Sequence, residues 1–261
     1  MNTLRLIWLH LRVNVMNEFQ YRANLVIQLI QSMLAAGTGL VALSLIFDRT
    51  PTLNGWTRPE LLVVMGVYMF VGGVIGFAIQ PAMNRIMSDV EHGTFDYVLT
   101  KPVDSQVLAS VREFRLWELT DSMVGVGVIV WGLTEVGAQL GPGEWASFVL
   151  AMVAGTIALY CLWLIPTCGA FWFTRMRDIQ DLYTGFYRAG QYPITVYPRW
   201  LRLTLTYLVP IGLAVTVPSQ TVTGQMTATR LFAMSGFIVA ALAVTRLVWR
   251  VGTRRYSGAS A

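Results

Sequence analysis

The sequence predicts an all-α polytopic membrane protein with six transmembrane helices, and composition is the first observation behind this. Of the 261 residues, 55% are hydrophobic and only 13% are charged, whereas about 25% are charged in an ordinary soluble domain. The mean hydropathy is +0.55. A chain this apolar has too few polar residues to cover a folded core with a surface that water can solvate. The composition therefore excludes a soluble globular enzyme.

Uncharged stretches are the second observation, and they mark the spans. Crossing a hydrocarbon core of about 30 Å takes about 20 helical residues. The third stretch reaches that length only when residues 116–121 are added, and the last needs Arg246 to lie near the interface, where its side chain can snorkel. The stretches run over 23–47, 61–84, 122–134, 145–174, 203–229 and 231–245. The expected spans lie at about 24–47, 61–80, 115–134, 146–172 and 229–250, with a fifth span before the last.

The distribution of Lys and Arg is the third observation, because cytoplasmic loops carry an excess of basic residues. Thirteen of the 19 basic residues fall in segments that are cytoplasmic when the N-terminus is inside: 1–22, 81–115, 173–177 and 246–261. Both termini are therefore expected in the cytoplasm. The same rule and the attraction to anionic membrane lipids account for the net charge of +5 without a nucleic-acid partner.

Residues 1–22 precede the first span and predict an amphipathic helix lying in the membrane interface. Apolar residues recur there at helical spacing, with charged residues on the other faces. A plain cytoplasmic extension of the first span is the alternative. The apolar positions are Leu4, Ile7, Trp8, Leu11 and Val15.

The fifth span is ambiguous. Hydropathy alone selects 203–218, but sixteen residues reach only about 24 Å, and Pro210 and Pro218 interrupt them. One interpretation makes 176–197 a span facing a wet cavity, with 198–222 dipping part-way into the outer leaflet; the other makes 173–202 a cytoplasmic loop. Irregular backbone at membrane depth is tolerated only where protein buries it or where it lines a cavity.

Catalysis has little support in the residues. The two histidines, His10 and His92, lie outside the spans, and neither HExxH nor GxSxG occurs. No GxxxxGK[ST] is present, so no nucleotide-binding domain is expected in this chain. Cys161 and Cys168 lie seven apart in one apolar run, about 10 Å along a helix, which is too far for a disulfide. They are expected to be packed small residues.

The cytoplasmic loop 81–112 is the most informative segment. Residues 82–91 predict a short helix, which Gly93 ends as a C′ glycine. Phe95, Tyr97, Val98 and Leu99 then present apolar side chains in a segment that should be wet. Exposed aromatic surface of this kind indicates docking of a partner; the alternative is that the loop tucks against the ends of its own helices.

Two motifs, EHGTFDYVLTKPVD at 91–104 and QYPITVYPRWLRLTLTYLVPIGLAVTVPSQTVTG at 191–224, together with the N-terminal helix, resemble the ABC transporter type-2 permease family. They are most similar to its branch of roughly 260-residue bacterial permeases encoded in pairs. The resemblance implies six spans, with 176–197 as the fifth and 198–222 as an extracellular-side re-entrant hairpin before the last helix. It also implies a multi-pass protein of the bacterial inner (plasma) membrane and a permease domain over 23–261.

The resemblance further implies that the loop between spans two and three couples to a separate ATP-binding subunit, present in two copies, which binds ATP and Mg. This chain would then bind no cofactor or metal and would not be an enzyme. The branch pairs the chain with a second permease that is related rather than identical. Residues carried over as contacts with the ATPase are Arg85, Asp89, Glu91, Gly93, Phe95 and Asp96.

Polar residues on spans one and five are candidates for the lining of a central pathway. Gln28 and Gln31 can equally form interhelical hydrogen bonds that hold the spans together. Gly72 and Gly76 in span two are four apart, which permits close helix approach. The resemblance implies that the chain is a subunit of an ATP-driven exporter; the alternative is an ATP-independent carrier or channel. The pathway candidates are Gln28, Gln31, Asp181, Tyr183, Arg188 and Gln191.

Overall fold

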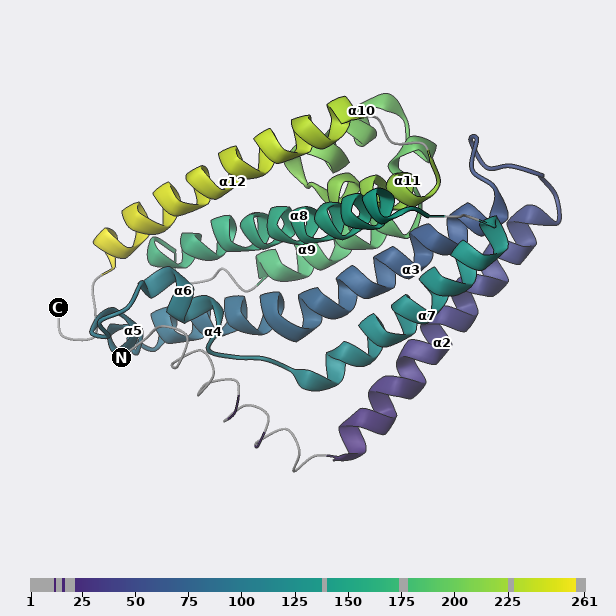
Figure 1. The fold of residues 1–261 in the computed structure, drawn as a ribbon. Coiled ribbons are helices and arrows are strands. Elements are labelled where there is room, and N and C mark those ends of the chain that lie inside the picture. Colours follow the sequence, from purple (N-terminus) through teal and green to yellow (C-terminus); the bar gives the residue numbers. More distant parts are fainter. Residues whose placement is uncertain are drawn as a thin grey trace.

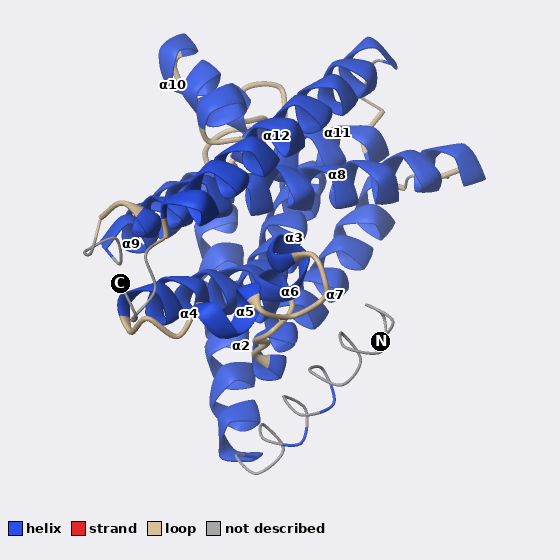
Figure 2. Cartoon of the chain, turned by 90° about the vertical axis from the view of Figure 1, so that its left-hand side faces the viewer, coloured by secondary structure: helices blue, strands red, loops and turns tan. Residues whose placement is uncertain are grey.

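The structure is a computed structural model that describes residues 22–137, 140–173, 178–224 and 228–256, together with Arg12 and Met16. The regular elements in these ranges are all helices (Figures 1 and 2). The all-α prediction is therefore confirmed. The interfacial helix predicted at 1–22 falls almost wholly outside the described residues.

Five helices in the described ranges are long and apolar enough to cross a membrane. They are Asn24–Phe47, Arg58–Glu91, Leu116–Val136, Pro142–Phe171 and Phe232–Arg255, which coincide with five of the predicted spans. In the labels of Figure 1 they contain α2 (Arg22–Phe47), α3 (Arg58–Val74) continuing through a π-helical turn (Ile75–Ile79) into α4 (Gln80–Glu91), α7 (Leu119–Val136), α8 (Pro142–Thr167) and α12 (Ala228–Arg255).

The segment expected as the fifth span differs from the prediction, because no single helix covers the described part of 176–197. α9 (Asp178–Tyr187) has 10 residues, about 15 Å of helix, and one 3₁₀ turn follows before the chain becomes extended at Tyr192. Pro193 comes next, and a proline disfavours helical backbone in the residue before it. The structure therefore has short helical pieces where one long helix was expected, namely α9 and the 3₁₀ turns Arg188–Gln191 and Ile194–Val196.

The Pro-rich segment after it contains the remaining candidate crossing. Arg199–Leu208 and Gly212–Val222 pass the length and apolarity test together but are bent by 83°, with Pro210 at the break. The pieces include α10 (Arg199–Leu203) and α11 (Val217–Val222), joined through π-helical turns. Residues 209–222 are all buried, which meets the requirement that irregular backbone at membrane depth be covered by protein.

α3 and α7 cross closely through glycines. A Cβ built on Gly125 would lie 2.5 Å from the backbone N of Phe70, and one on Gly66 would lie 2.6 Å from the backbone N of Ile129. The two backbones therefore touch. Gly72 and Gly76 serve other contacts, because Gly72 faces the Tyr187 ring and Gly76 faces the carboxylate of Glu118, just before α7.

Replacing Gly125 with alanine is expected to destabilise the protein by about 1–3 kcal/mol, because the added methyl forces two backbones apart. Gly127→Ala is the matched control, since a Cβ there has no neighbour within 4 Å. Thermal unfolding of the detergent-purified variants measures both. Equal unfolding temperatures for the two variants would show that the crossing is loose.

Candidate functional site

The α3–α4 helix extends well beyond the length that a membrane requires. Arg58–Glu91 has 34 residues, roughly 50 Å at 1.5 Å per residue, against a hydrocarbon core of about 30 Å. Its α4 end lies beside the two short loop helices α5 (Asp96–Leu99) and α6 (Ser105–Ser110) (Figure 1). This part of loop 81–112 is therefore a rigid continuation of the second span.

The end of α4 is shaped by a glycine. His92 is the C-cap, and Gly93 has φ 69°, a left-handed conformation that glycine adopts without a Cβ penalty. The prediction that Gly93 ends this helix is confirmed. The chain then turns back, so that the backbone N–H groups of Thr94 and Phe95 donate to the Asp89 carbonyl at 2.8 and 3.1 Å.

Asp89 holds the turn from inside. Its side chain is only 5% exposed and forms ion pairs with Arg85 Nε at 3.1 Å and with Arg112 Nη1 at 2.6 Å. The Thr94 hydroxyl donates to the same carboxylate at 3.0 Å. Two cations and a hydroxyl thus compensate a buried charge, so Asp89 organises the loop from within and does not present its carboxylate to a partner.

Phe95 is fully buried, which corrects the expectation of an exposed aromatic surface at this position. Its ring meets Phe171, Trp249 and Tyr256 with centroid distances of 5.4, 5.9 and 5.6 Å. Edge-to-face packing of this kind is favourable for aromatic rings. These four residues, here called the aromatic clasp, join the loop to the end of α8 and to α12. At Phe95 the structure shows the alternative interpretation: the loop packs against helices of the same chain.

A second set of contacts ties the loop to α12. Asp104 caps α6 by accepting from the backbone N–H groups of Gln106 and Val107, and Arg246 forms an ion pair with it. The hydrogen bond from the Arg246 guanidinium lowers the pKa of the Asp104 carboxyl below its ordinary value of 3.8. Trp249 Nε1 also donates to Ser105 Oγ at 3.1 Å. The loop is therefore fixed to α12 at both its aromatic and its polar end.

The exposed part of the loop is smaller than the sequence indicated. Tyr97 is 69% exposed and Leu99 is 39% exposed, and Glu91 is exposed beside them, whereas Asp96 is half-buried. Among the predicted contact residues, Arg85 and Glu91 are thus exposed, and Gly93 and Asp96 are half-buried. Tyr97 is the largest accessible apolar side chain in this loop, and the sequence analysis left it out of the proposed contacts.

The predicted pathway residues on α2 do not share one environment. Gln28 Nε2 donates to a carboxylate oxygen of Glu118 at 3.0 Å, and the Ser32 hydroxyl donates to Asp121. These bonds join α2 to the start of α7, so the interpretation of Gln28 as an interhelical hydrogen-bonding residue is the one the structure supports. Gln31 is exposed.

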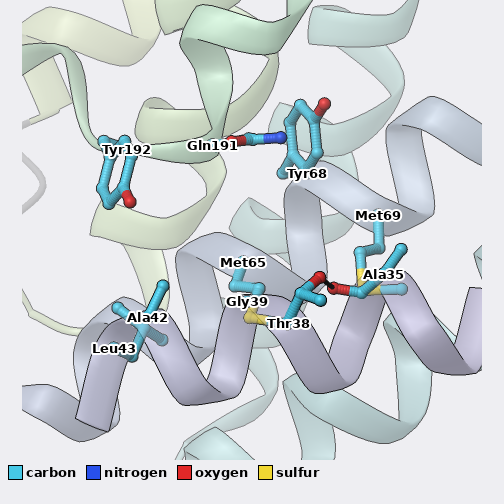
Figure 3. A pocket seen from close by; sticks show the side chains of 10 residues that line it. All are labelled: Ala35, Thr38, Gly39, Ala42, Leu43, Met65, Tyr68, Met69, Gln191 and Tyr192. Carbon is cyan, nitrogen blue, oxygen red and sulfur yellow. Dashed lines mark hydrogen bonds between the residues drawn. The ribbon is translucent and has the colours of Figure 1, made fainter. Parts of the chain in front are cut away.

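A cavity of about 320 Å³ lies between α2, α3 and the segment after α9 (Figure 3). Gln191 is the one predicted pathway residue that lines it. Asp181 and Arg188 are exposed, and Tyr183 packs against Trp163 at a centroid distance of 5.6 Å. The signal that the sequence analysis missed is the helical spacing of small residues on the first span. The cavity is lined by Ala35, Thr38, Gly39, Ala42, Leu43, Met65, Tyr68, Met69, Gln191 and Tyr192.

Cys161 and Cys168 are free and buried, as predicted for packed small residues. Across the described ranges, no group of three or more His, Cys, Asp or Glu residues is placed to hold a metal ion.

The geometry so far is that of a helical membrane protein whose second span continues into a clasped loop. Among families of known proteins, the one described as ABC-2 family transporter protein matches residues 33–260. The search of curated proteins found no match. The matched range takes in the clasped loop, the cavity and the bent segment. The chain therefore belongs to the ABC-2 transporter family, as a membrane-spanning permease component.

Proposed function

We propose that the chain is the permease subunit of an ATP-driven exporter and that loop 81–104 couples it to a separate ATP-binding subunit. Two copies of that subunit would bind ATP and Mg and hydrolyse the nucleotide. A second permease chain, related rather than identical, would complete the pathway. The bacterial inner membrane with both termini in the cytoplasm is the expected setting. The charge distribution supports the orientation, and the resemblance to the paired bacterial permeases supports export.

The observation that carries the proposal is the clasped end of the α3–α4 helix. A soluble subunit that moves this loop acts on α3 directly, because the helix is continuous. It acts on α8 and α12 as well, because the aromatic clasp and the Asp104–Arg246 ion pair fix the loop to both. Well-packed interiors transmit displacement with little compression. Movement of one loop would therefore tilt three spans together.

The outer end would close where the α2–α3 loop meets the short segment Ile194–Val196, which precedes the Pro-rich segment. The Trp56 Nε1 of the α2–α3 loop donates to Thr195 Oγ1 at 2.9 Å, and the Asn54 amide donates to the Thr195 carbonyl. Asn54 and Gly55 have φ of 51° and 87°, so a tight turn brings both donors to the segment. In the proposed cycle this contact holds the outer gate shut until the spans tilt.

The Tyr97→Ala variant tests the coupling surface. Truncating an aromatic residue at the centre of an interface costs about 2 kcal/mol or more, so the ATP-binding subunit should bind about thirtyfold less tightly. The measurement is the amount of a soluble ATPase that co-purifies with the tagged chain in mild detergent.

Tyr207→Ala is the matched control, because Tyr207 is a similarly exposed tyrosine, 63% against 69%, on the bent segment rather than on the loop. The ATPase should co-purify with the Tyr207→Ala variant as it does with the unmodified chain. If no ATPase co-purifies with the unmodified chain, the coupling proposal fails and an ATP-independent carrier takes its place.

A further inference from the structure

We propose that the cavity between α2 and α3 binds uncharged amphipathic molecules with an aromatic or alkyl body and excludes anions and cations of the same shape. The inference rests on the proposed function, because it names the substrate class of a permease. It depends on this cavity alone, however, and not on the loop that would bind an ATPase.

The walls of the cavity differ in character. α2 contributes the small residues Ala35, Gly39 and Ala42 to the lining. α3 contributes the thioethers of Met65 and Met69 (Figure 3). Methionine side chains are flexible and polarisable, so they adapt to apolar bodies of varied shape. The α2–α3 side is thus an adaptable apolar wall.

Hydrogen-bonding groups gather opposite that wall. The Gln191 amide points toward Tyr68, and Tyr192 lies on the same segment (Figure 3). The Thr38 hydroxyl is used within α2, where it donates to the Leu34 and Ala35 carbonyls at 2.9 Å each. The Gln191 amide is hydrogen-bonded to the Tyr68 hydroxyl, so this pair and the Tyr192 phenol are the polar groups of the lining that can orient a polar end of a ligand.

Tyr68 is held in place before any ligand binds. Its ring stacks on Tyr187 at a centroid distance of 4.8 Å and an interplanar angle of 15°, and the Tyr187 hydroxyl donates to the Tyr68 carbonyl at 2.6 Å. A preorganised aromatic ring offers contact area at a low entropy cost. The Tyr68 ring is thus a rigid contact surface for an aromatic or alkyl body, beside the flexible methionine side chains.

Charge is what the lining lacks. None of the ten lining residues is ionisable near neutral pH. The charged groups that act on the Tyr68 hydroxyl, Arg188 and Asp121, are opposite in sign and lie outside the lining. An ion without a partner in an apolar site is strongly disfavoured. A neutral ligand avoids that cost, and about 320 Å³ lies at the lower end of volumes typical for small-molecule sites.

Two dyes with the same aromatic body test the charge selectivity. N-phenyl-1-naphthylamine is neutral, and 1-anilinonaphthalene-8-sulfonate adds one sulfonate. The full chain in phosphatidylcholine nanodiscs should bind the neutral dye saturably, above the signal of empty nanodiscs, and the anionic dye at least tenfold more weakly. Equal or tighter binding of the anionic dye would overturn the proposed substrate class, and so would the absence of saturable binding of the neutral dye.

Two variants on the same helix test the location. Ala42→Phe fills the cavity and should weaken binding of the neutral dye at least tenfold. Val41→Phe is the control, because Val41 is 59% exposed and is not among the lining residues. Both variants should elute as the unmodified chain does. Equal affinity in the two variants would place the dye elsewhere. Co-purification of the ATPase is measured on the same samples, so failure of the cavity and failure of the coupling loop give different results.

Discussion

Phe95→Ala is expected to destabilise the loop by about 3–5 kcal/mol, the usual cost of truncating a fully buried phenylalanine. Phe95 lies at the centre of the aromatic clasp and has no exposed surface. Its removal leaves a cavity between Phe171, Trp249 and Tyr256, all of which lose a ring contact. Hydrogen exchange over residues 92–101 measures the effect and should accelerate in the variant.

The neighbouring Tyr97→Ala variant is the control for this result. Tyr97 is 69% exposed, so its truncation should change exchange in the loop by little, since exposed substitutions usually fall within about 0.5 kcal/mol. The two variants also separate two functions. Phe95→Ala should loosen the connection of the loop to α8 and α12, whereas Tyr97→Ala should weaken partner binding on an intact loop. Equal exchange rates in the two variants would contradict the clasp.

Much of the fold could be predicted because membrane spans are a local signal. Each of five spans is a run of apolar residues long enough to cross, and charged residues bound it, so composition alone locates it within a few residues. Gly93 could be predicted for the same reason, since a glycine after an amphipathic stretch ends a helix through backbone conformation alone.

The position of Phe95 could not be predicted, because its partners are remote in the sequence. Phe171 and Trp249 lie in other spans, and an aromatic residue in a short loop between spans has the same local pattern whether it faces a partner or its own helices. The same limit applies to Gln28, whose partner Glu118 is on another helix. Long-range pairing decides both roles, and it has no local sequence signature.

The fifth span shows where hydropathy and length both fail. Residues 203–218 are apolar but contain Pro210, and residues 176–197 are long enough but contain Pro193 near their end. In the structure neither range is one straight helix, because each proline ends a helical piece. Residues 209–222 are buried, and packing against segments remote in the sequence has no local signature from which it could be predicted.

Asp89→Asn should be as damaging as the loss of Phe95, although it changes only one atom. The carboxylate pairs with Arg85 and Arg112, whose side chains are 47% and 21% exposed, and is itself 5% exposed. Removing one partner of a buried ion pair costs about 3–5 kcal/mol. Arg112 is the more buried of the two cations, so the loss of the Asp89 charge weakens its charge compensation most.

Limited trypsin digestion measures this change, since trypsin cleaves after Arg112 only when the loop opens. Cleavage tracks the population of the open form when opening and closing are fast, so a loss of about 3 kcal/mol corresponds to a rate more than a hundredfold higher. Asp96→Asn is the matched control, because Asp96 belongs to the same loop and is half-buried, and it should leave cleavage nearly unchanged. Equal cleavage of the two variants would mean that backbone hydrogen bonds and the aromatic clasp hold the loop without the Asp89 charge.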